Sequence, residues 1–232
     1  MEATGTQDSG PIRTGAPVLD YGIAMAASFA VASALFERAT SGKGAFIDVS
    51  MLETGLSLMS STVTDFLKTG NEPKRRGNLA NSRSPGAGSF PCKEGVMSLG
   101  VNEESHFVSL AKALDRVDWL SDERFAQREA RKSHAAELAS QIETELLKRT
   151  AEEWESLLQT AGVPSARLRN MAEALNSEHV KKRGFVQTTE AGVSVPTLPF
   201  RIGGVPAYKP SRNAPVHGEH TDEILSWLSD DS

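Results

Sequence analysis

The residue best placed to do chemistry is a carboxylate, Asp20, which stands directly before the apolar run of residues 21–35. Two interpretations compete. Asp20 can be the N-cap of a helix, where its side-chain oxygen accepts from backbone N–H groups that the first turn leaves unpaired. The same placement can instead hold an ionised carboxylate that takes part in a reaction, because a helix N-terminus favours negative charge.

A glycine-rich stretch, "SPGAGS" at residues 84–89, is the second candidate. Gly86 and Gly88 allow the backbone to approach a ligand closely and to present N–H groups to a developing oxyanion. The alternative is a flexible joint between two domains. The stretch lacks the G-x-G-x-x-G order and the strand-to-helix context of a dinucleotide site.

The sequence has no metal-ligand spacing, so we expect no bound metal. The single cysteine, Cys92, lies in a predicted strand and is expected to be a small buried apolar group rather than a nucleophile. The histidines are scattered, without the H-x-x-x-H spacing or the carboxylate grouping of a metal site. They are His106, His134, His179, His217 and His220.

The element that must position Asp20 is a predicted helix over about residues 20–40. It is apolar on nearly every face and rich in Ala, Ser and Gly, so neighbouring backbones can approach it closely. Gly42 and Gly44 supply the conformations that end a helix. Its apolar run is shorter than the roughly 20 residues that span a bilayer. We therefore expect a buried helix, not a membrane span.

Composition divides the chain into parts with different periodicity. Residues 1–68 hold the first helix and a second one predicted over about 50–68, and the segment 69–89 is rich in Gly, Pro, Asn and Ser and is predicted to be a linker. Residues 90–172 are predicted to form a small α+β domain. Residues 173–232 return through short helices and loop to a last helix.

The small domain has the clearest local signals. "FPCKEGVMSLGV" predicts two short strands around a turn, and helices are predicted over about 104–114, 131–149 and 151–161. Thr150 and Glu153 have the spacing of a capping box at the start of the last of these helices. In the closing "GEHTDEILSWL" we expect Thr221 to cap the final helix.

Charge and composition bear on the partners and the location of the protein. The chain has 232 residues and a net charge of −5, with 25 basic and 30 acidic residues interspersed. No large basic field favours nucleic acid, so we expect no such partner. The opening "MEATGTQDSG" has neither the basic nor the apolar region of a signal peptide. With a single cysteine, a reducing cytoplasm is the predicted location.

The segment "GAPVLDYGIAMAASFAVASALFERATSGKGAFIDVSMLETGL" resembles the region around the nucleophile in class III CoA-transferases. The shared pattern is an Asp that opens an Ala-rich helix, followed by A-L-x-x-R, T-G-K-G-Q, and V-D before a second helix. The matching residues are Asp20, Ala34, Leu35, Arg38, 41–44 and Asp48. The later "KEG", "ERFAQREAR", "EEWESLLQTAGVPSARLRNMAEAL" and "GEHTDEIL" follow the family pattern in the same order.

The resemblance implies an α/β fold made of α+β pieces. It would be the C-terminal portion of the family fold: a helix-rich remnant of the large Rossmann-like domain plus the small α+β domain. It implies that Asp20 attacks an acyl-CoA thioester, with coenzyme A entering as acyl-CoA and a small carboxylic acid as the second substrate. It also implies that a glycine-rich loop, here Gly86 and Gly88, folds over the aspartyl intermediate.

The chain departs from the family pattern in two ways. Ala45 stands where the family usually has Gln, and Ala24 where a Gly often follows the Asp, which changes packing near the acyl group. The match also covers only the later part of the family pattern. The CoA-binding half that precedes the nucleophile in the family is not matched, so we expect this chain to be incomplete without it.

Three functions therefore remain open. The first is CoA transfer between an acyl-CoA and a carboxylic acid. The second is racemisation beside a CoA thioester, as in the divergent α-methylacyl-CoA racemase branch, with Asp20 as one acid or base of a pair. The third is a non-catalytic truncated fragment that associates through exposed apolar surface. The resemblance implies an interlocked homodimer or a separate chain that supplies the CoA-binding half.

Overall fold

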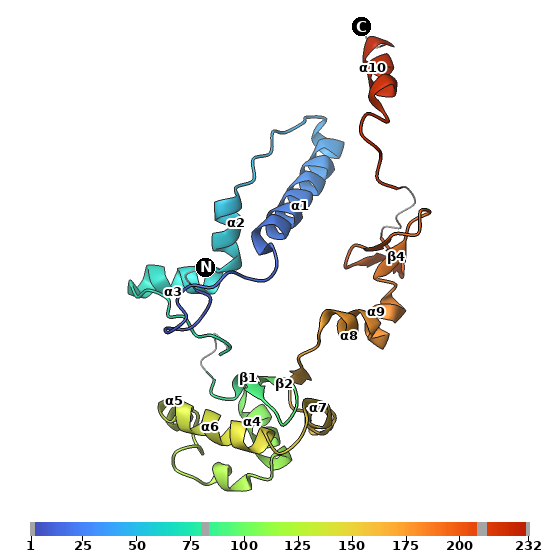
Figure 1. Ribbon diagram of the computed structural model, residues 1–232. Coiled ribbons are helices and arrows are strands. Elements are labelled where there is room, and N and C mark those ends of the chain that lie inside the picture. The colour runs from blue at the N-terminus through green and yellow to red at the C-terminus, as the bar shows by residue number, and fades with distance from the viewer. Residues whose placement is uncertain (1–2, 80–83, 208–212, 231–232) are drawn as a thin grey trace. The chain divides into compact units, whose positions relative to one another are not determined.

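The computed structural model describes residues 3–79, 84–207 and 213–230, and the chain divides into a first unit, Met1–Arg167, and a second unit, Leu168–Ser232. Figure 1 shows the order of the elements along the chain. Parts of the predicted linker 69–89 and return segment 173–232 lie outside the described residues. The predicted domain boundaries themselves stay predictions.

The first unit opens with a long helix, α1 (Val18–Ser41), which matches the predicted helix over 20–40. Gly42 ends it in the left-handed conformation at φ 70°, and its N–H donates to the carbonyl of Arg38. Glycine adopts this conformation without the strain that a side chain would add. The predicted stop at "TSGKG" is therefore confirmed.

The second predicted helix, over 50–68, is two helices in the structure. They are α2 (Met51–Leu58) and α3 (Ser60–Thr69). The break is at Met59, with φ −105° and ψ 22°, and the hydroxyl of Ser60 donates to the carbonyl of Ser57 there. Serine side chains compete with the backbone for such carbonyls, which the periodicity of apolar residues does not reveal.

Two glycines bring α1 and α2 close together. A Cβ atom at Gly22 would lie 3.2 Å from Leu58 Cδ1, and one at Gly55 would lie 3.1 Å from Leu19 Cδ2. Each helix thus places a leucine against a glycine of the other. This reciprocal contact fixes the first turn of α1, which carries Asp20, against α2.

The prediction that the first helix is buried is wrong for the described part of the chain. None of the residues of α1 is buried, and the Phe29 and Phe36 side chains are 76% and 79% exposed. The small domain has its own core. By length and composition alone α1 is also long and apolar enough to cross a membrane, a test that core helices of soluble proteins pass as well.

The small domain is built on a three-stranded antiparallel sheet in the order β1-β2-β3. The strands are β1 (Ala87–Pro91), β2 (Val96–Gly100) and β3 (Ser165–Arg167). The predicted strand pair is confirmed, with Phe90 opposite Met97, and β1 begins inside the predicted linker. The helices of the domain are α4 (Glu104–Ala113), the 3-10 helix η1 (Val117–Leu120), α5 (Arg128–Ser133), α6 (Ala135–Leu146) and α7 (Ala151–Thr160).

The helix predicted over 131–149 begins earlier and is interrupted at His134, which separates α5 from α6. The core lies between the sheet and these helices and centres on Trp119, which stacks on Phe107 at 6.3 Å and meets Phe125 edge-on at 6.5 Å. The Trp154 indole donates to the carbonyl of Leu146 at 2.8 Å. The indole N–H of Trp154 is thus paired, as burial of a polar group requires.

The second unit consists of short elements. They are α8 (Met171–Asn176), α9 (Glu178–Arg183), β4 (Val186–Thr188), β5 (Ser194–Pro196), β6 (Arg201–Ile202), β7 (Val205–Pro206) and α10 (Thr221–Asp230). The guanidinium of Arg201 donates to the carbonyls of Lys182 and Arg183 at the end of α9. Thr221 is the first helical residue of α10, not its N-cap, because the carbonyl of His220 accepts the first helical hydrogen bond, from the N–H of Ile224.

The capping box at the start of α7 gives the first testable prediction. The Thr150 hydroxyl accepts from the N–H of Glu153, and the Glu153 carboxylate accepts from the N–H of Thr150 at 2.9 Å. Replacing Thr150 with Ala leaves the Glu153 N–H without this partner, so the free energy of unfolding is expected to fall by about 1 kcal/mol. Urea unfolding of the whole chain, followed by tryptophan fluorescence, measures the change.

Thr160→Ala, at the other end of α7, is the matched control. Its hydroxyl donates to the carbonyl of Ser156 at 2.8 Å, a bond that an exposed helix end does not need. Its loss is expected to change the unfolding free energy by less than about 0.5 kcal/mol. Equal effects of the two substitutions would contradict the capping role of Thr150.

Candidate functional site

Asp20 lies in the first turn of α1 but is not its N-cap. The N-cap is Pro17, and no side chain caps the helix there. Proline presets a backbone angle suited to a helix start, so the helix begins at Val18 and places Asp20 at its third position. The N-cap interpretation of Asp20 is therefore wrong.

The Asp20 carboxylate is exposed and has no hydrogen-bond or ion-pair partner among residues 3–79, 84–207 and 213–230. A negative charge in the first helical turn is favoured by the partial positive charge of the unpaired N–H groups. Asp20 is thus an exposed carboxylate in the first turn of an apolar helix, without a partner among the described residues. That arrangement suits attack on an electrophilic carbon once water is excluded.

Gly86 and Gly88 are buried and closely packed. A Cβ atom at Gly86 would lie 2.9 Å from Val101 Cβ, and one at Gly88 would lie 3.2 Å from the carbonyl oxygen of Asn78. Gly88 belongs to β1 and pairs with Leu99. Both glycines are therefore required by packing. A role of their N–H groups toward a substrate stays a prediction.

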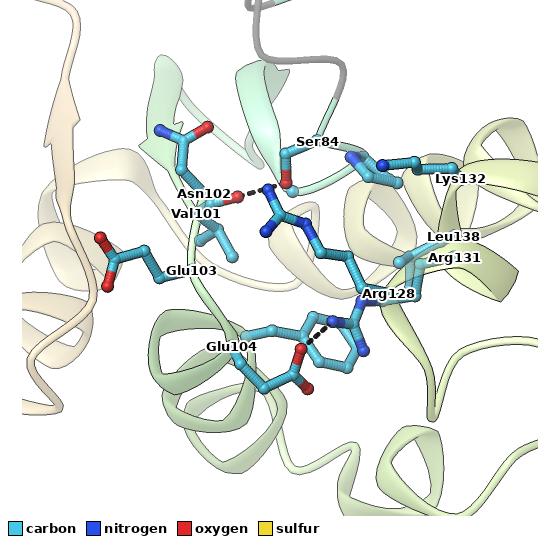
Figure 2. A pocket seen from close by; sticks show the side chains of 12 residues that line it. Ser84, Val101, Asn102, Glu103, Glu104, Arg128, Arg131, Lys132 and Leu138 are labelled. Carbon is cyan, nitrogen blue, oxygen red and sulfur yellow. Dashed lines mark hydrogen bonds and ion pairs between the residues drawn. The ribbon is translucent and has the colours of Figure 1, made fainter.

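A small cavity lies beside the Ser84–Gly86 turn, with a volume of about 20 Å³. Figure 2 shows its lining side chains. The residues that matter for its charge are Glu103, Glu104, Arg128, Arg131 and Lys132. Asp20 does not line it. A cavity of this size has room for about one water-sized group, not for an acyl chain.

Arg131 is the structural cation of this cavity. It is 5% exposed, pairs with Glu104, donates to the carbonyl of Phe125 at 2.7 Å, and lies over the Phe107 ring at 4.1 Å. A buried guanidinium is stable because its donors and charge are satisfied in this way. Arg131 thus joins α4 to α5 and to the loop before it.

Sequence reasoning missed the cationic side of this cavity. The sequence "ERFAQREAR" contains Arg128 and Arg131, and Lys132 follows it directly. From the sequence, this stretch was interpreted only as part of the family pattern. The i, i+3, i+4 spacing places these three cations on one side of a helix. That spacing in the sequence could have predicted a cationic side of the cavity.

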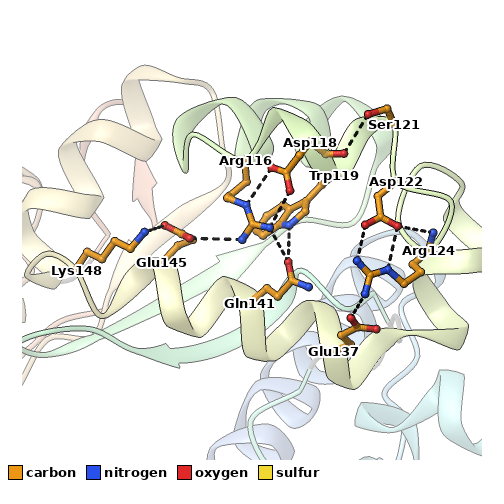
Figure 3. A network of polar contacts seen from close by, with 10 residues as sticks. All are labelled: Arg116, Asp118, Trp119, Ser121, Asp122, Arg124, Glu137, Gln141, Glu145 and Lys148. Atoms are coloured by element: carbon orange, nitrogen blue, oxygen red, sulfur yellow. Dashed lines mark hydrogen bonds and ion pairs between the residues drawn. The ribbon is translucent and has the colours of Figure 1, made fainter.

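A polar network around Arg116 is the other concentration of charge in the small domain (Figure 3). The Arg116 guanidinium donates to Asp118 at 2.9 Å, to Gln141 at 2.8 Å and to Glu145 at 3.5 Å. The Gln141 oxygen also accepts from the Trp119 indole at 2.8 Å. Hydrogen bonding to Arg116 lowers the pKa of Asp118. These groups satisfy one another and hold Trp119 in the core.

A second ion pair in Figure 3 joins Arg124 to Asp122 at 2.6 Å, and Arg124 also pairs with Glu137. Hydrogen bonding from the Arg124 side chain lowers the pKa of Asp122 to about 2. A lowered pKa stabilises the fold above the ordinary value of 3.8, and that contribution is lost as the pH falls toward 2. Such a carboxylate is ionised at neutral pH and is not a proton donor.

Within the described residues, no group of three or more His, Cys, Asp or Glu side chains comes together in a way that could hold a metal ion. Burial raises the pKa of the Cys92 thiol. A thiol with a raised pKa is a poor nucleophile at neutral pH.

The model of CoA-transferase family III matches residues 1–221 of the chain. Succinyl-CoA–D-citramalate CoA-transferase from Chloroflexus aurantiacus is 29% identical, over 97% of this chain and 57% of that protein. Succinate–glutarate CoA-transferase from Agrobacterium fabrum is 28% identical, over 98% of this chain and 58% of that protein. The chain thus spans little more than half the length of these curated relatives.

Solved structures are consistent with the family match. A CaiB/BaiF family protein from Brucella suis superposes with a TM-score of 0.81 and 26% identity, over 98% of this chain and 60% of that one. A Mycobacterium tuberculosis protein superposes with a TM-score of 0.80 at 21% identity, over 94% of this chain and 58% of that one, which shows the fold alone. The predicted mixed helix-and-sheet fold of this family is confirmed.

The packing of Gly86 gives the second prediction. In Gly86→Ala the new methyl group meets the fixed Cβ of Val101, so β1 or the turn must shift, and the unfolding free energy is expected to fall by about 1–3 kcal/mol. Gly44→Ala is the control, because a Cβ atom there has nothing within 4 Å. Thermal unfolding of the purified chain measures both. A Gly86→Ala chain as stable as Gly44→Ala would show that the close contact is not a constraint.

Proposed function

Because the chain belongs to CoA-transferase family III, we propose that it moves coenzyme A from an acyl-CoA to a carboxylic acid, with Asp20 as the nucleophile. The observation that supports this assignment is an exposed carboxylate in the first turn of α1 without a partner among the described residues. The resemblance of the surrounding segment to the family implies the nucleophile at this residue. The names of two relatives contain succinate or succinyl-CoA, glutarate and citramalate. Short dicarboxylic acids are therefore the first acceptors to test.

The proposed reaction runs through two kinds of aspartyl intermediate. A carboxylate oxygen of Asp20 attacks the thioester carbonyl carbon, the C–S bond breaks, and CoA leaves as a thiolate from an acyl-aspartyl anhydride. The thiolate then attacks the Asp20 carboxyl carbon and releases the first acid, which leaves an aspartyl-CoA thioester. The acceptor carboxylate attacks the carbonyl carbon of this thioester, the C–S bond breaks to release the CoA thiolate again, and a new aspartyl anhydride of the acceptor forms. The thiolate attacks the new acyl carbon and frees Asp20.

Each intermediate is an activated acyl group that water would hydrolyse, so this chemistry requires a dry site. The described residues leave α1 exposed. We therefore propose that the working enzyme covers α1 with a second copy in an interlocked homodimer, or with a separate chain that supplies the CoA-binding half. This enzyme would act in the cytoplasm.

Neutralising Asp20 tests the proposed nucleophile. Asp20→Asn keeps the shape of the side chain but removes the charge that attacks the thioester. Transfer of CoA from succinyl-CoA to labelled glutarate is expected to fall by at least about 1,000-fold, as for loss of a catalytic nucleophile. The assay separates labelled glutaryl-CoA from the free acid.

Glu37→Gln is the matched control, because it neutralises an exposed carboxylate near the other end of α1. It is expected to leave transfer unchanged. An Asp20→Asn chain that transfers CoA at the parent rate would exclude the nucleophile. Deuterium exchange at the carbon beside the thioester, without change of acyl group, would instead favour racemisation.

Sedimentation tests whether a second copy of the chain covers α1. We expect particles larger than the 24.9 kDa of one chain. Phe29→Lys places a charge in the middle of the exposed apolar face and is expected to weaken association by about tenfold or more, because burying an unpaired charge is costly. Phe46→Lys, at a side chain that is 96% exposed outside the helices, is the control. Particles of one chain at every concentration would contradict the proposed dimer.

A further inference from the structure

We propose that the cavity beside the Ser84–Gly86 turn binds the oxyanion head group of a small ligand, a carboxylate or a phosphate, with Arg128 as the cation that meets it. The binding itself needs no catalysis. Only the identity of the ligand, an acid substrate or a phosphate of CoA, rests on the proposed function.

The cations that line the cavity differ in what already neutralises them. Arg131 is held by Glu104 and by backbone carbonyls. Lys132 pairs with the exposed Glu129 at 2.7 Å. Arg128 has no hydrogen-bond or ion-pair partner within the part of the chain that the structure describes. Among the described residues, one guanidinium at this cavity is therefore without a direct hydrogen-bond or ion-pair partner.

The acidic lining does not supply the missing charge. The Glu104 carboxylate is engaged by Arg131. Figure 2 shows the Glu103 carboxylate turned away from Arg128, while the Arg128 side chain extends toward Ser84. A planar guanidinium with free donors at a cavity is suited to a carboxylate or phosphate, because two of its N–H groups can bond two oxygens at once.

The size and backbone of the cavity limit the ligand to a head group. A volume of about 20 Å³ holds about one water-sized group, so the cavity takes one oxygen of the oxyanion and leaves the others outside it. The buried Gly86, which also lines the cavity, has a backbone N–H with no acceptor within the described residues. This N–H is a second donor at the same cavity. The body of the ligand must then extend outward past the Ser84–Gly86 turn.

Calorimetric titration of the whole chain with sodium glutarate and, separately, with inorganic phosphate tests this site, at an ionic strength kept constant with sodium chloride. We expect saturable binding of at least one of the two anions. Arg128→Gln is expected to raise its dissociation constant about tenfold or more, because a charge-assisted hydrogen bond is lost. Lys112→Gln, which removes an equal charge from α4 outside the cavity, is expected to leave it unchanged.

Stronger binding of glutarate would identify the ligand as an acid substrate, and stronger binding of phosphate would identify it as a phosphate of CoA. Absence of saturation with both anions would overturn the site, as would an equal effect of the two substitutions in chains of equal thermal stability. No acyl-CoA is present, so the result is independent of CoA transfer. A chain that binds an anion at Arg128 but whose Asp20→Asn form transfers CoA at the parent rate would overturn the proposed function alone.

Discussion

The structure depends on one constraint: α1 carries large apolar side chains and buries none of them. Covering a Phe or Leu side chain contributes about 1.5–3 kcal/mol, so a face with several of them has a strong tendency to be covered. The same helix presents Asp20 in its first turn. A partner surface that covers α1 would therefore also keep water from the carboxylate. Burial of the same apolar face would then drive association and provide the dry site that the reaction requires.

The small domain stands in contrast, because both buried indole N–H groups and the buried guanidinium of Arg131 are paired within it. Arg116 and Gln141 hold the Trp119 indole, and Arg131 joins α4 to α5. Such networks fix a core but leave few groups free for ligands. Among the described residues, Arg128 lies at the cavity without a direct hydrogen-bond or ion-pair partner. The functional demands on the chain are thus divided between a helix pair with an uncovered surface and a domain that folds around its own core.

Local rules predicted the parts of this structure that local residues determine. The capping box of Thr150 and Glu153, the strand pair and the stop at Gly42 depend on neighbours in sequence, and all are confirmed. The break at Met59 was missed because apolar periodicity does not reveal a local contact such as that of the Ser60 hydroxyl with the carbonyl of Ser57. The exposure of α1 was missed because the composition of a helix shows that it needs cover but not what supplies it. The family pattern predicted that Asp20 lies at the start of this helix, which the structure shows. The prediction that Asp20 is the N-cap was wrong, because the N-cap is Pro17.

The central claim is that the Asp20 carboxylate becomes covalently linked to coenzyme A. Acid quenching of the chain during turnover with succinyl-CoA and glutarate, followed by proteolysis and mass spectrometry, tests it directly. The account predicts a CoA thioester on the peptide that contains Asp20, cleaved by hydroxylamine and absent from Asp20→Asn. CoA transfer that proceeds without this adduct, or with the adduct on another residue, would contradict it.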